Sequence, residues 1–128
     1  MKKLSMIMMI VLVASCSSPS SKKHTPLSVK NEMINSFKNE KIINIKKNCL
    51  SIQSNTEFYC TCISDSHLKF YMESLEVINF ERIATYMNNK ENEYAQTNAS
   101  IEMMKLTTSY MGKVLEEKPN TACMEKKA

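Results

Sequence analysis

The chain has 128 residues, with 17 basic against 13 acidic side chains and a formal net charge of +4. A chain of this length forms one domain with one modest core. The net charge is small and its bases are dispersed among acids, which excludes the basic surface that a nucleic-acid partner requires.

Residues 1–15 have the layout of a secretory signal peptide. Lys2 and Lys3 give it a positive start, Leu4 to Val13 form a mostly apolar run interrupted by Ser5, and small residues follow. This run is too short to cross a membrane, because ~30 Å of hydrocarbon needs roughly 20 apolar residues. We therefore expect export rather than a membrane span.

The end of this segment, Val13-Ala14-Ser15-Cys16, resembles the bacterial lipobox: an aliphatic residue, two small residues and a cysteine. The resemblance implies that the Cys16 sulfur receives diacylglycerol, that the chain is cut before Cys16, and that the new amine is acylated, as with palmitate. Two or three acyl chains, at about 0.8 kcal/mol per buried CH₂, would anchor the protein to a membrane. The non-acidic Ser17 implies an outer-membrane address, facing the periplasm of a Gram-negative cell.

These features divide the chain into a signal peptide at 1–15, a lipidated cysteine with a flexible tether at 16–26, and a helical domain at 27–128. The tether, SSPSSKKHTP at 17–26, contains two prolines and no large apolar side chain. Removal of Lys2 and Lys3, with no acidic residue in 1–15, lowers the formal charge from +4 to +2.

The domain is predicted to be an all-α, disulfide-stapled bundle of about four helices. From Leu27 onward it has one glycine, Gly112, and one proline, Pro119, so it lacks the turn signals that strands and hairpins need. The first helix is expected from Ser28 to Ile52. Its apolar residues recur at spacings of three to five: Ile34, Phe37, Ile42, Ile45, Cys49 and Ile52.

The second and third helices are predicted from their caps. Asn55 or Thr56 is a good N-cap for a helix that ends between Met72 and Ser74, and Asn79 is the expected N-cap of the next one. The apolar side of the second helix is predicted to carry Tyr59, Cys62, Ile63 and Phe70. The third helix has Phe80, Ile83, Ala84 and Met87 at helical spacing.

The fourth helix has the clearest periodicity. It follows the polar stretch NNKEN at 88–92, which is expected to be a loop, and it should run from near Asn98 to Lys118, with Pro119 just past its end. Strict spacing of three and four residues links Ile101, Met104, Thr108, Met111 and Leu115, with Tyr94 one heptad earlier.

The methionines are interpreted as flexible core residues. Of the 11 in the chain, Met1, Met6, Met8 and Met9 precede Cys16, and most of the other seven fall on apolar stripes. A copper(I) site is the alternative, but no Met-x-x-Met cluster accompanies them.

Four cysteines remain when Cys16 is assigned to lipid, and an even number in a small exported domain is typical of two disulfides. Cys60 and Cys62 project about 200° apart if they share a helix, so they cannot bond to each other. Two pairings are left: Cys49–Cys60 with Cys62–Cys123, or Cys49–Cys62 with Cys60–Cys123.

The position of the turn favours the first pairing. A hairpin that turns near Ser54 places Cys49 opposite Tyr59, next to Cys60. The second pairing stays open, because Cys62 shares an apolar stripe with Tyr59, and Cys49 lies on the matching stripe of the first helix.

Catalytic and metal-binding interpretations are weaker. A redox-active Cys60-x-Cys62 dithiol normally sits on a βαβ scaffold, which the sequence does not predict. Zinc bound by Cys60, Cys62 and His67 lacks the usual Cys-x₂₋₄-Cys spacing. Asp65-Ser66-His67 has the residue types of a hydrolytic triad, but neighbours on a helix point about 100° apart. We therefore expect no enzyme activity, cofactor or metal.

Two further resemblances concern the domain. Tyr59-Cys60-Thr61-Cys62, with Cys49 and Cys123, resembles a pattern in small exported helical bacterial proteins of unknown function. Size, anchor and stapled helices are also similar to type II secretion pilotins and to periplasmic immunity proteins that block type VI amidase effectors. The resulting hypothesis is a non-catalytic lipoprotein that binds an envelope or effector protein, of immunity, secretion-assembly or exclusion type. The alternative is a periplasmic thiol-disulfide oxidoreductase or isomerase that uses Cys60 and Cys62.

Overall fold

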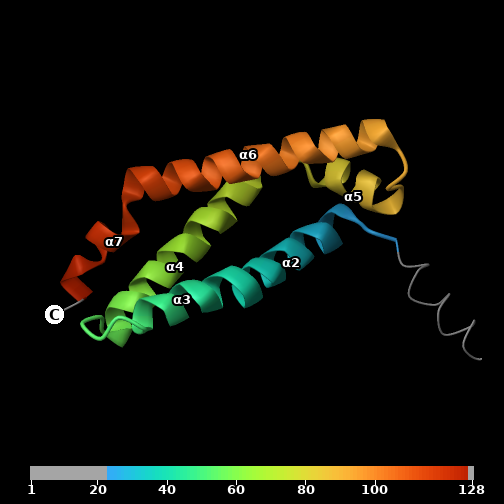
Figure 1. Cartoon of the computed structure of the whole chain (residues 1–128). Coiled ribbons are helices and arrows are strands. Elements are labelled where there is room, and N and C mark those ends of the chain that lie inside the picture. The colour runs from blue at the N-terminus through green and yellow to red at the C-terminus, as the bar shows by residue number, and fades with distance from the viewer. Residues whose placement is uncertain (1–22, 127–128) are drawn as a thin grey trace, which may run out of the picture.

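The structure is a computed structural model that describes residues 23–126. The described part is a helical bundle without strands, as the sequence predicts (Figure 1). Within it, none of the helices is both long and apolar enough to cross a membrane. The proposed signal peptide, the Cys16 lipidation site and most of the tether lie outside the described residues.

The first helix is continuous from Pro26 to Leu50 and consists of α2 (Pro26–Ser36), a π-helical segment η1 (Phe37–Ile42) and α3 (Ile43–Leu50). It begins earlier than expected, because Thr25 and Ser28 form a reciprocal capping box in front of Pro26. Pro26, which the sequence placed in the tether, is therefore helical. The helix also ends before Ile52, which is 55% exposed.

The π-helical segment explains the irregular spacing of the first apolar stripe. Phe37 and Ile42 are five residues apart, and the π-helix closes turns of that size, as in the bond from the Ile43 N–H to the Lys38 carbonyl. The wider turn keeps the apolar residues before and after it on one side of the helix.

The second helix, α4 (Glu57–Ser74), is capped by the Thr56 hydroxyl and ends where the sequence predicts. It packs against α3 as the second arm of a hairpin (Figure 1). A 3-10 turn, η2 (Leu75–Val77), leads into α5 (Phe80–Asn88), whose predicted N-cap Asn79 is confirmed.

The last long helix, α6 (Glu93–Glu117), begins five residues earlier than the predicted Asn98, because the Asn92 side chain caps it. It ends at Lys118, whose positive φ of 48° terminates the helix. Pro119 then starts the short α7 (Pro119–Ala122), and η3 (Met124–Lys126) follows. Figure 1 shows α2 and α6 on either side of α4, with α5 near the start of α6.

Two apolar clusters hold these helices together. The larger, which we call the α5-end core, joins α2, α4, α5 and α6, and the smaller, the disulfide-end core, lies where α3, α4 and the C-terminal residues meet. The α5-end core consists of Val29, Phe37, Tyr71, Leu75, Ile78, Ile83, Ala84, Ala99 and Leu106. The disulfide-end core consists of Tyr59, Cys60, Ile63 and Cys123.

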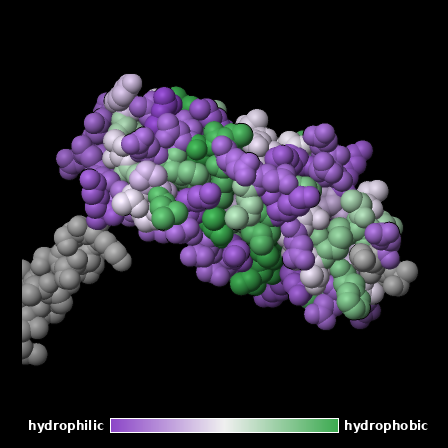
Figure 2. All heavy atoms as spheres, turned by 180° about the vertical axis from the view of Figure 1, so that it is seen from behind, coloured by the Kyte–Doolittle hydropathy of each residue, from purple (hydrophilic) through white to green (hydrophobic). Residues whose placement is uncertain are grey.

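The interpretation of the methionines as core residues holds only for Met33 and Met87, which are half-buried and pack against the α5-end core, whereas the other five are exposed. None of the seven that follow Cys16 is buried, and Met104 on α6 is 69% exposed. The buried residues of α6 are instead Ala95, Ala99, Glu102 and Leu106. Figure 2 shows a band of hydrophobic side chains between hydrophilic regions on one face of the molecule.

Candidate binding groove

A groove of about 730 Å³ lies between the α2–η1 helix and α6. Val29, Met33 and Phe37 lie along one wall, and the other wall is the side of α6 that carries Leu106 and Tyr110. The remaining lining residues include Tyr71 from α4, Ile83 and Met87 from α5, Ile45 from α3, and Met103, Thr107 and Met111 from α6. Three long helices therefore surround an apolar groove that none of them fills.

Three aromatic rings that contact one another form part of the groove surface. The Phe37 and Tyr71 rings are stacked with centroids 3.9 Å apart, and the Tyr110 ring meets the edge of Phe37 at 5.6 Å. The Tyr71 hydroxyl donates to the Met33 carbonyl oxygen at 3.4 Å. Burial raises the pKa of Tyr71 and of Tyr110, so both hydroxyls stay protonated at neutral pH.

Behind this surface, His67 of α4 supports Tyr110. Its Nδ1 atom is hydrogen-bonded to the Tyr110 hydroxyl. Burial lowers the pKa of His67, which favours the neutral imidazole. In the neutral ring, Nδ1 can accept a hydrogen bond from the Tyr110 hydroxyl. His67 thus positions a groove residue from outside the groove.

Four of the methionines line the groove: Met33, Met87, Met103 and Met111. Methionine has three rotatable bonds and a polarisable sulfur, so a surface rich in it can adapt to different apolar side chains. These four methionines therefore line an open apolar surface and do not fill a closed core.

Charge is present on only one rim of the groove. Glu32, Glu40 and Lys41 lie on the α2–η1 side, whereas the α6 side presents Met103, Thr107 and Met111. A ligand in this groove meets two carboxylates and one ammonium group along one edge and an uncharged edge opposite.

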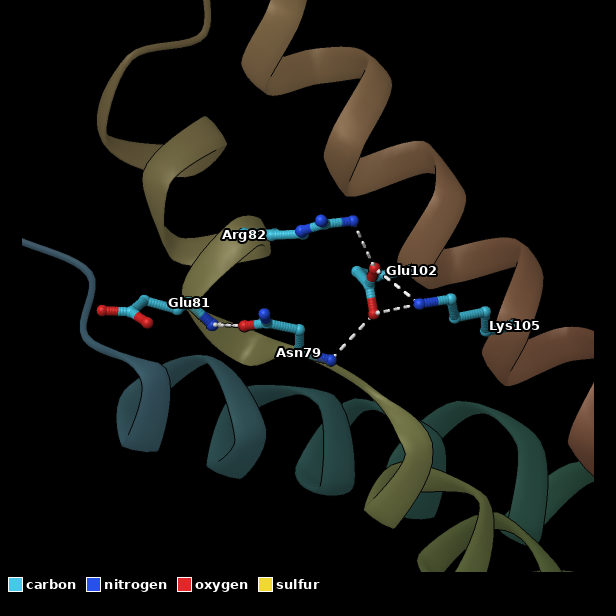
Figure 3. Close-up of polar contacts among 5 residues, drawn as sticks. All are labelled: Asn79, Glu81, Arg82, Glu102 and Lys105. Carbon is cyan, nitrogen blue, oxygen red and sulfur yellow. Dashed lines mark hydrogen bonds and ion pairs between the residues drawn. The ribbon is translucent and has the colours of Figure 1, made fainter.

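A buried carboxylate fixes the α5 end of the groove. Glu102 projects from α6 and is completely buried; it accepts hydrogen bonds from the Asn79 backbone N–H at 2.8 Å and from Arg82 at 3.2 Å (Figure 3). Lys105 lies 3.2 Å from the same carboxylate. These contacts hold the start of α5 against α6, and α5 carries Ile83 and Met87 into the groove.

The same contacts decide the charge of Glu102. The Asn79 N–H lowers the pKa of this carboxyl most, Lys105 and Arg82 lower it further, and burial opposes them. The sequence interpretation missed Glu102, although one signal was available: it lies between Ala99 and Leu106 at helical spacing, on an otherwise apolar side.

The four cysteines that the structure describes form two disulfides, Cys49–Cys60 and Cys62–Cys123, with Cα atoms 5.6 and 5.9 Å apart. This is the pairing that the hairpin argument favours, and Cys49–Cys62 and Cys60–Cys123 do not form. The bonds join α3 to α4 and α4 to the C-terminal segment. They lie beyond the far end of the groove, where Ile45 packs against the disulfide-end core and also lines the groove.

The other residues that the sequence brought forward do not form a site together. Ser66 donates its hydroxyl proton to the Cys62 carbonyl, His67 contacts Tyr110 and Asp65 is exposed, so no triad forms among them. Across residues 23–126, no three His, Cys, Asp or Glu residues group in a way that could hold a metal ion.

Comparison of the chain with protein-family models, with curated proteins and with solved structures found no match. The groove and its surroundings are therefore the basis for a functional proposal.

Proposed function

We propose that this protein is a non-catalytic, lipid-anchored protein of the bacterial envelope that binds an amphipathic helix of another protein in the groove between α2–η1 and α6. The observation that carries the proposal is the open, methionine-lined apolar groove itself. Apolar grooves of this kind between helices are a recurrent binding site for the apolar face of a helix.

The dimensions of the groove favour a helix as its ligand. Val29 and Ile45 lie along one wall and are 16 residues apart, which corresponds to about 24 Å of helix or roughly four turns. The long helices around the groove leave the place of a fourth helix empty over most of this length, because α5 has only nine residues. A bound helix would complete a four-helix bundle.

The rim of the groove favours a particular kind of helix. Glu32, Glu40 and Lys41 lie on the α2–η1 side, and Lys41 is the one closest to α3 along the chain. No charged residue lines the α6 side of the groove. The complementary ligand has a row of large apolar residues, a mainly basic edge toward α2–η1 and an uncharged edge toward α6.

The sequence supports an anchored location for this binding domain. The lipobox-like Val13-Ala14-Ser15-Cys16 supports acylation at Cys16, in an outer membrane facing the periplasm. At most about 25 Å of extended chain can separate Cys16 from Lys23, the first described residue. The partner would therefore be an envelope or effector protein that comes close to the membrane, as in immunity, secretion-assembly or exclusion.

The thiol-oxidoreductase alternative receives less support. Cys60 is completely buried, and Cys60 and Cys62 are each bonded to a cysteine from another segment. An external thiolate would have to reach one of these sulfurs for exchange to begin.

The proposal is tested by photo-crosslinking the full chain in its own cells from a photo-reactive residue at Thr107, on the groove rim. We expect one protein to be captured through an amphipathic helix. Met103→Glu places a carboxylate in the groove and should lower the adduct yield about tenfold or more. The adjacent Met104→Glu is the matched control, because Met104 does not line the groove.

Two results would contradict the proposal. One is the same adduct from a photo-reactive residue at Lys69, an exposed position of α4 outside the groove. The other is an adduct yield from Thr107 that Met103→Glu and Met104→Glu lower equally, or no adduct at all.

A further inference from the structure

The outer side of α6 carries an apolar heptad repeat that is exposed, opposite the buried residues of the same helix. Met104 and Leu115 are 69% and 71% exposed, and Tyr94 is 77% exposed. We call this repeat the outer seam; its members are Tyr94, Ile101, Met104, Thr108, Met111 and Leu115. Alternate spacings of three and four residues are those of a helix that packs along another helix.

The outer seam offers enough surface for a stable interface. Its apolar members and Val77 of η2, which is 56% exposed, together expose on the order of 700 Å², close to the ~800 Å² that each partner contributes to a standard interface. Next to the outer seam is a hollow of about 530 Å³. Val77, Ile101, Met104 and Thr108 are among its lining residues, so it can receive a side chain from a facing helix.

The residues that flank the outer seam permit close approach of a second helix. The residues on either side of the central part of the outer seam are Asn98, Ser100, Lys105, Thr107, Gly112 and Val114. Lys105 is the only charged residue among them, and it is already paired with Glu102 at 3.2 Å. Gly112, the only glycine of the chain, lies in the last heptad. A Cβ atom at Gly112 would meet no atom within 4 Å, so packing inside the described chain does not require a glycine there, whereas a neighbouring helix does benefit from one.

The helix dipole favours one direction of packing, because an antiparallel pair of α6 helices opposes the two dipoles and a parallel pair aligns them. The charged side chains at the ends of α6 give no net preference: Glu93 starts the helix, and Glu116 and Glu117 precede Lys118 at its end.

We infer that a second copy of this chain covers the outer seam, and that the two α6 helices form an antiparallel, two-fold symmetric pair. With the axis midway between Met104 and Thr108, each Met104 enters the hollow beside the other copy's Thr108, and Ile101 faces the other copy's Met111. A self-complementary surface of this kind is what a two-fold dimer requires. The outer seam shares Met111 with the groove, and the other groove residues of α6, Met103, Leu106, Thr107 and Tyr110, lie on a neighbouring side of the helix.

The test uses two differently tagged copies of the full chain, expressed together, with a photo-reactive residue at Thr108. We expect a crosslinked product that contains both tags. Met104→Glu should lower its yield about tenfold or more, because each dimer would bury two carboxylates. Leu115→Glu, a second variant at an exposed position of the outer seam, should also lower the yield. Met103→Glu is the control and should leave the yield of this product unchanged.

The register of the pair has its own readout. From a photo-reactive residue at Thr97, the adduct should map to the segment around Leu115 of the second copy, and an adduct between the two Thr97 segments would overturn the antiparallel arrangement. The whole inference fails if no product carries both tags, if Thr108 captures only another protein, or if Met104→Glu and Leu115→Glu leave the yield unchanged.

Discussion

The two ends of the bundle are stabilised in different ways. At the disulfide end, four buried residues form a small core and two covalent bonds join α3, α4 and the C-terminal segment. At the α5 end, nine buried residues form the larger core, and Glu102 is the polar tie between α5 and α6. The groove lies beside this second core, with Phe37, Tyr71 and Leu106 belonging to both.

The difference shows how an open groove is compatible with a small domain. Burial alone gives a domain of this size only a marginal free energy of unfolding. Disulfides at one end add stability without using apolar surface, so α2–η1 and α6 can leave theirs uncovered along the groove. The two ends should therefore respond differently to the loss of a disulfide and to the loss of apolar burial.

Removal of the long-range disulfide should have the largest effect on the disulfide end. Cys62→Ser with Cys123→Ser opens a loop with a sequence separation of 61 and should lower the free energy of unfolding by about 4 kcal/mol. The same change at Cys49 and Cys60, with a separation of 11, should cost about 3 kcal/mol. Urea unfolding measures both; a larger loss from the shorter loop would contradict this account.

The α5 end should respond instead to loss of apolar burial. Leu75 is 1% exposed, and Leu75→Ala should lower the free energy of unfolding by about 3 kcal/mol. Leu27→Ala is the matched control, because Leu27 is 67% exposed, lines neither the groove nor the outer seam, and should change the stability by no more than about 0.5 kcal/mol. Equal losses in the two variants would show that the assignment of the core is wrong.

Glu102 should make the α5 end sensitive to acid. Glu102→Gln should destabilise the protein by about 2 kcal/mol at pH 7, because the Asn79 N–H and Arg82 lose a charged acceptor. The pKa of Glu102 is lowered in the folded state, so the unfolded chain binds the proton more tightly. The stability from Glu102 is therefore present above its unfolded pKa and is lost as pH falls through its folded pKa.

This pH dependence distinguishes Glu102 from a purely steric contact. Urea unfolding of both proteins from pH 7 to pH 3 should show the difference between wild type and Glu102→Gln shrinking as the pH falls. Hydrogen exchange should be faster at the start of α5 in the variant and unchanged near Cys60. A constant difference across this pH range would refute the role assigned to the charge.

The smallest effect is expected at His67. Burial lowers its pKa in the folded state, so between the folded and unfolded pKa values the unfolded chain binds more protons. The free energy of unfolding should therefore decrease as pH falls below about 6.5, the usual imidazole value. An NMR titration of the His67 ring should give a pKa below 6.5, and Tyr110→Phe should change that titration; a raised pKa would contradict the structure.

Local chemistry made much of this fold predictable. The N-caps Thr56 and Asn79 act within their own turns, so the sequence around them suffices. The hairpin near Ser54 placed Cys49 beside Cys60 by simple counting along two helices. The π-helical turn has a trace in the sequence, in the five-residue spacing of Phe37 and Ile42.

The orientation of α6 was not predictable in the same way, because this helix has two apolar sides. The periodicity of large side chains indicates that the outer seam is the buried side of α6. The structure instead buries the side that carries Ala95 and Ala99. Small side chains let α5 and α6 pack closely, and a close contact excludes water more completely than one between flexible methionines. Glu102 could be placed only once Arg82 and Asn79 were known to meet it in space.

The central claim is that Met103 and Met104, which are adjacent in α6, belong to two different binding surfaces, the groove and the outer seam. Crosslinking yields from Thr107 and Thr108 test it most directly. Met103→Glu should lower the yield of the heterologous adduct from Thr107 about tenfold or more and leave the yield of the homodimer adduct from Thr108 unchanged. Met104→Glu should do the reverse. If either variant lowers both yields, or neither variant lowers any, α6 does not carry two independent surfaces.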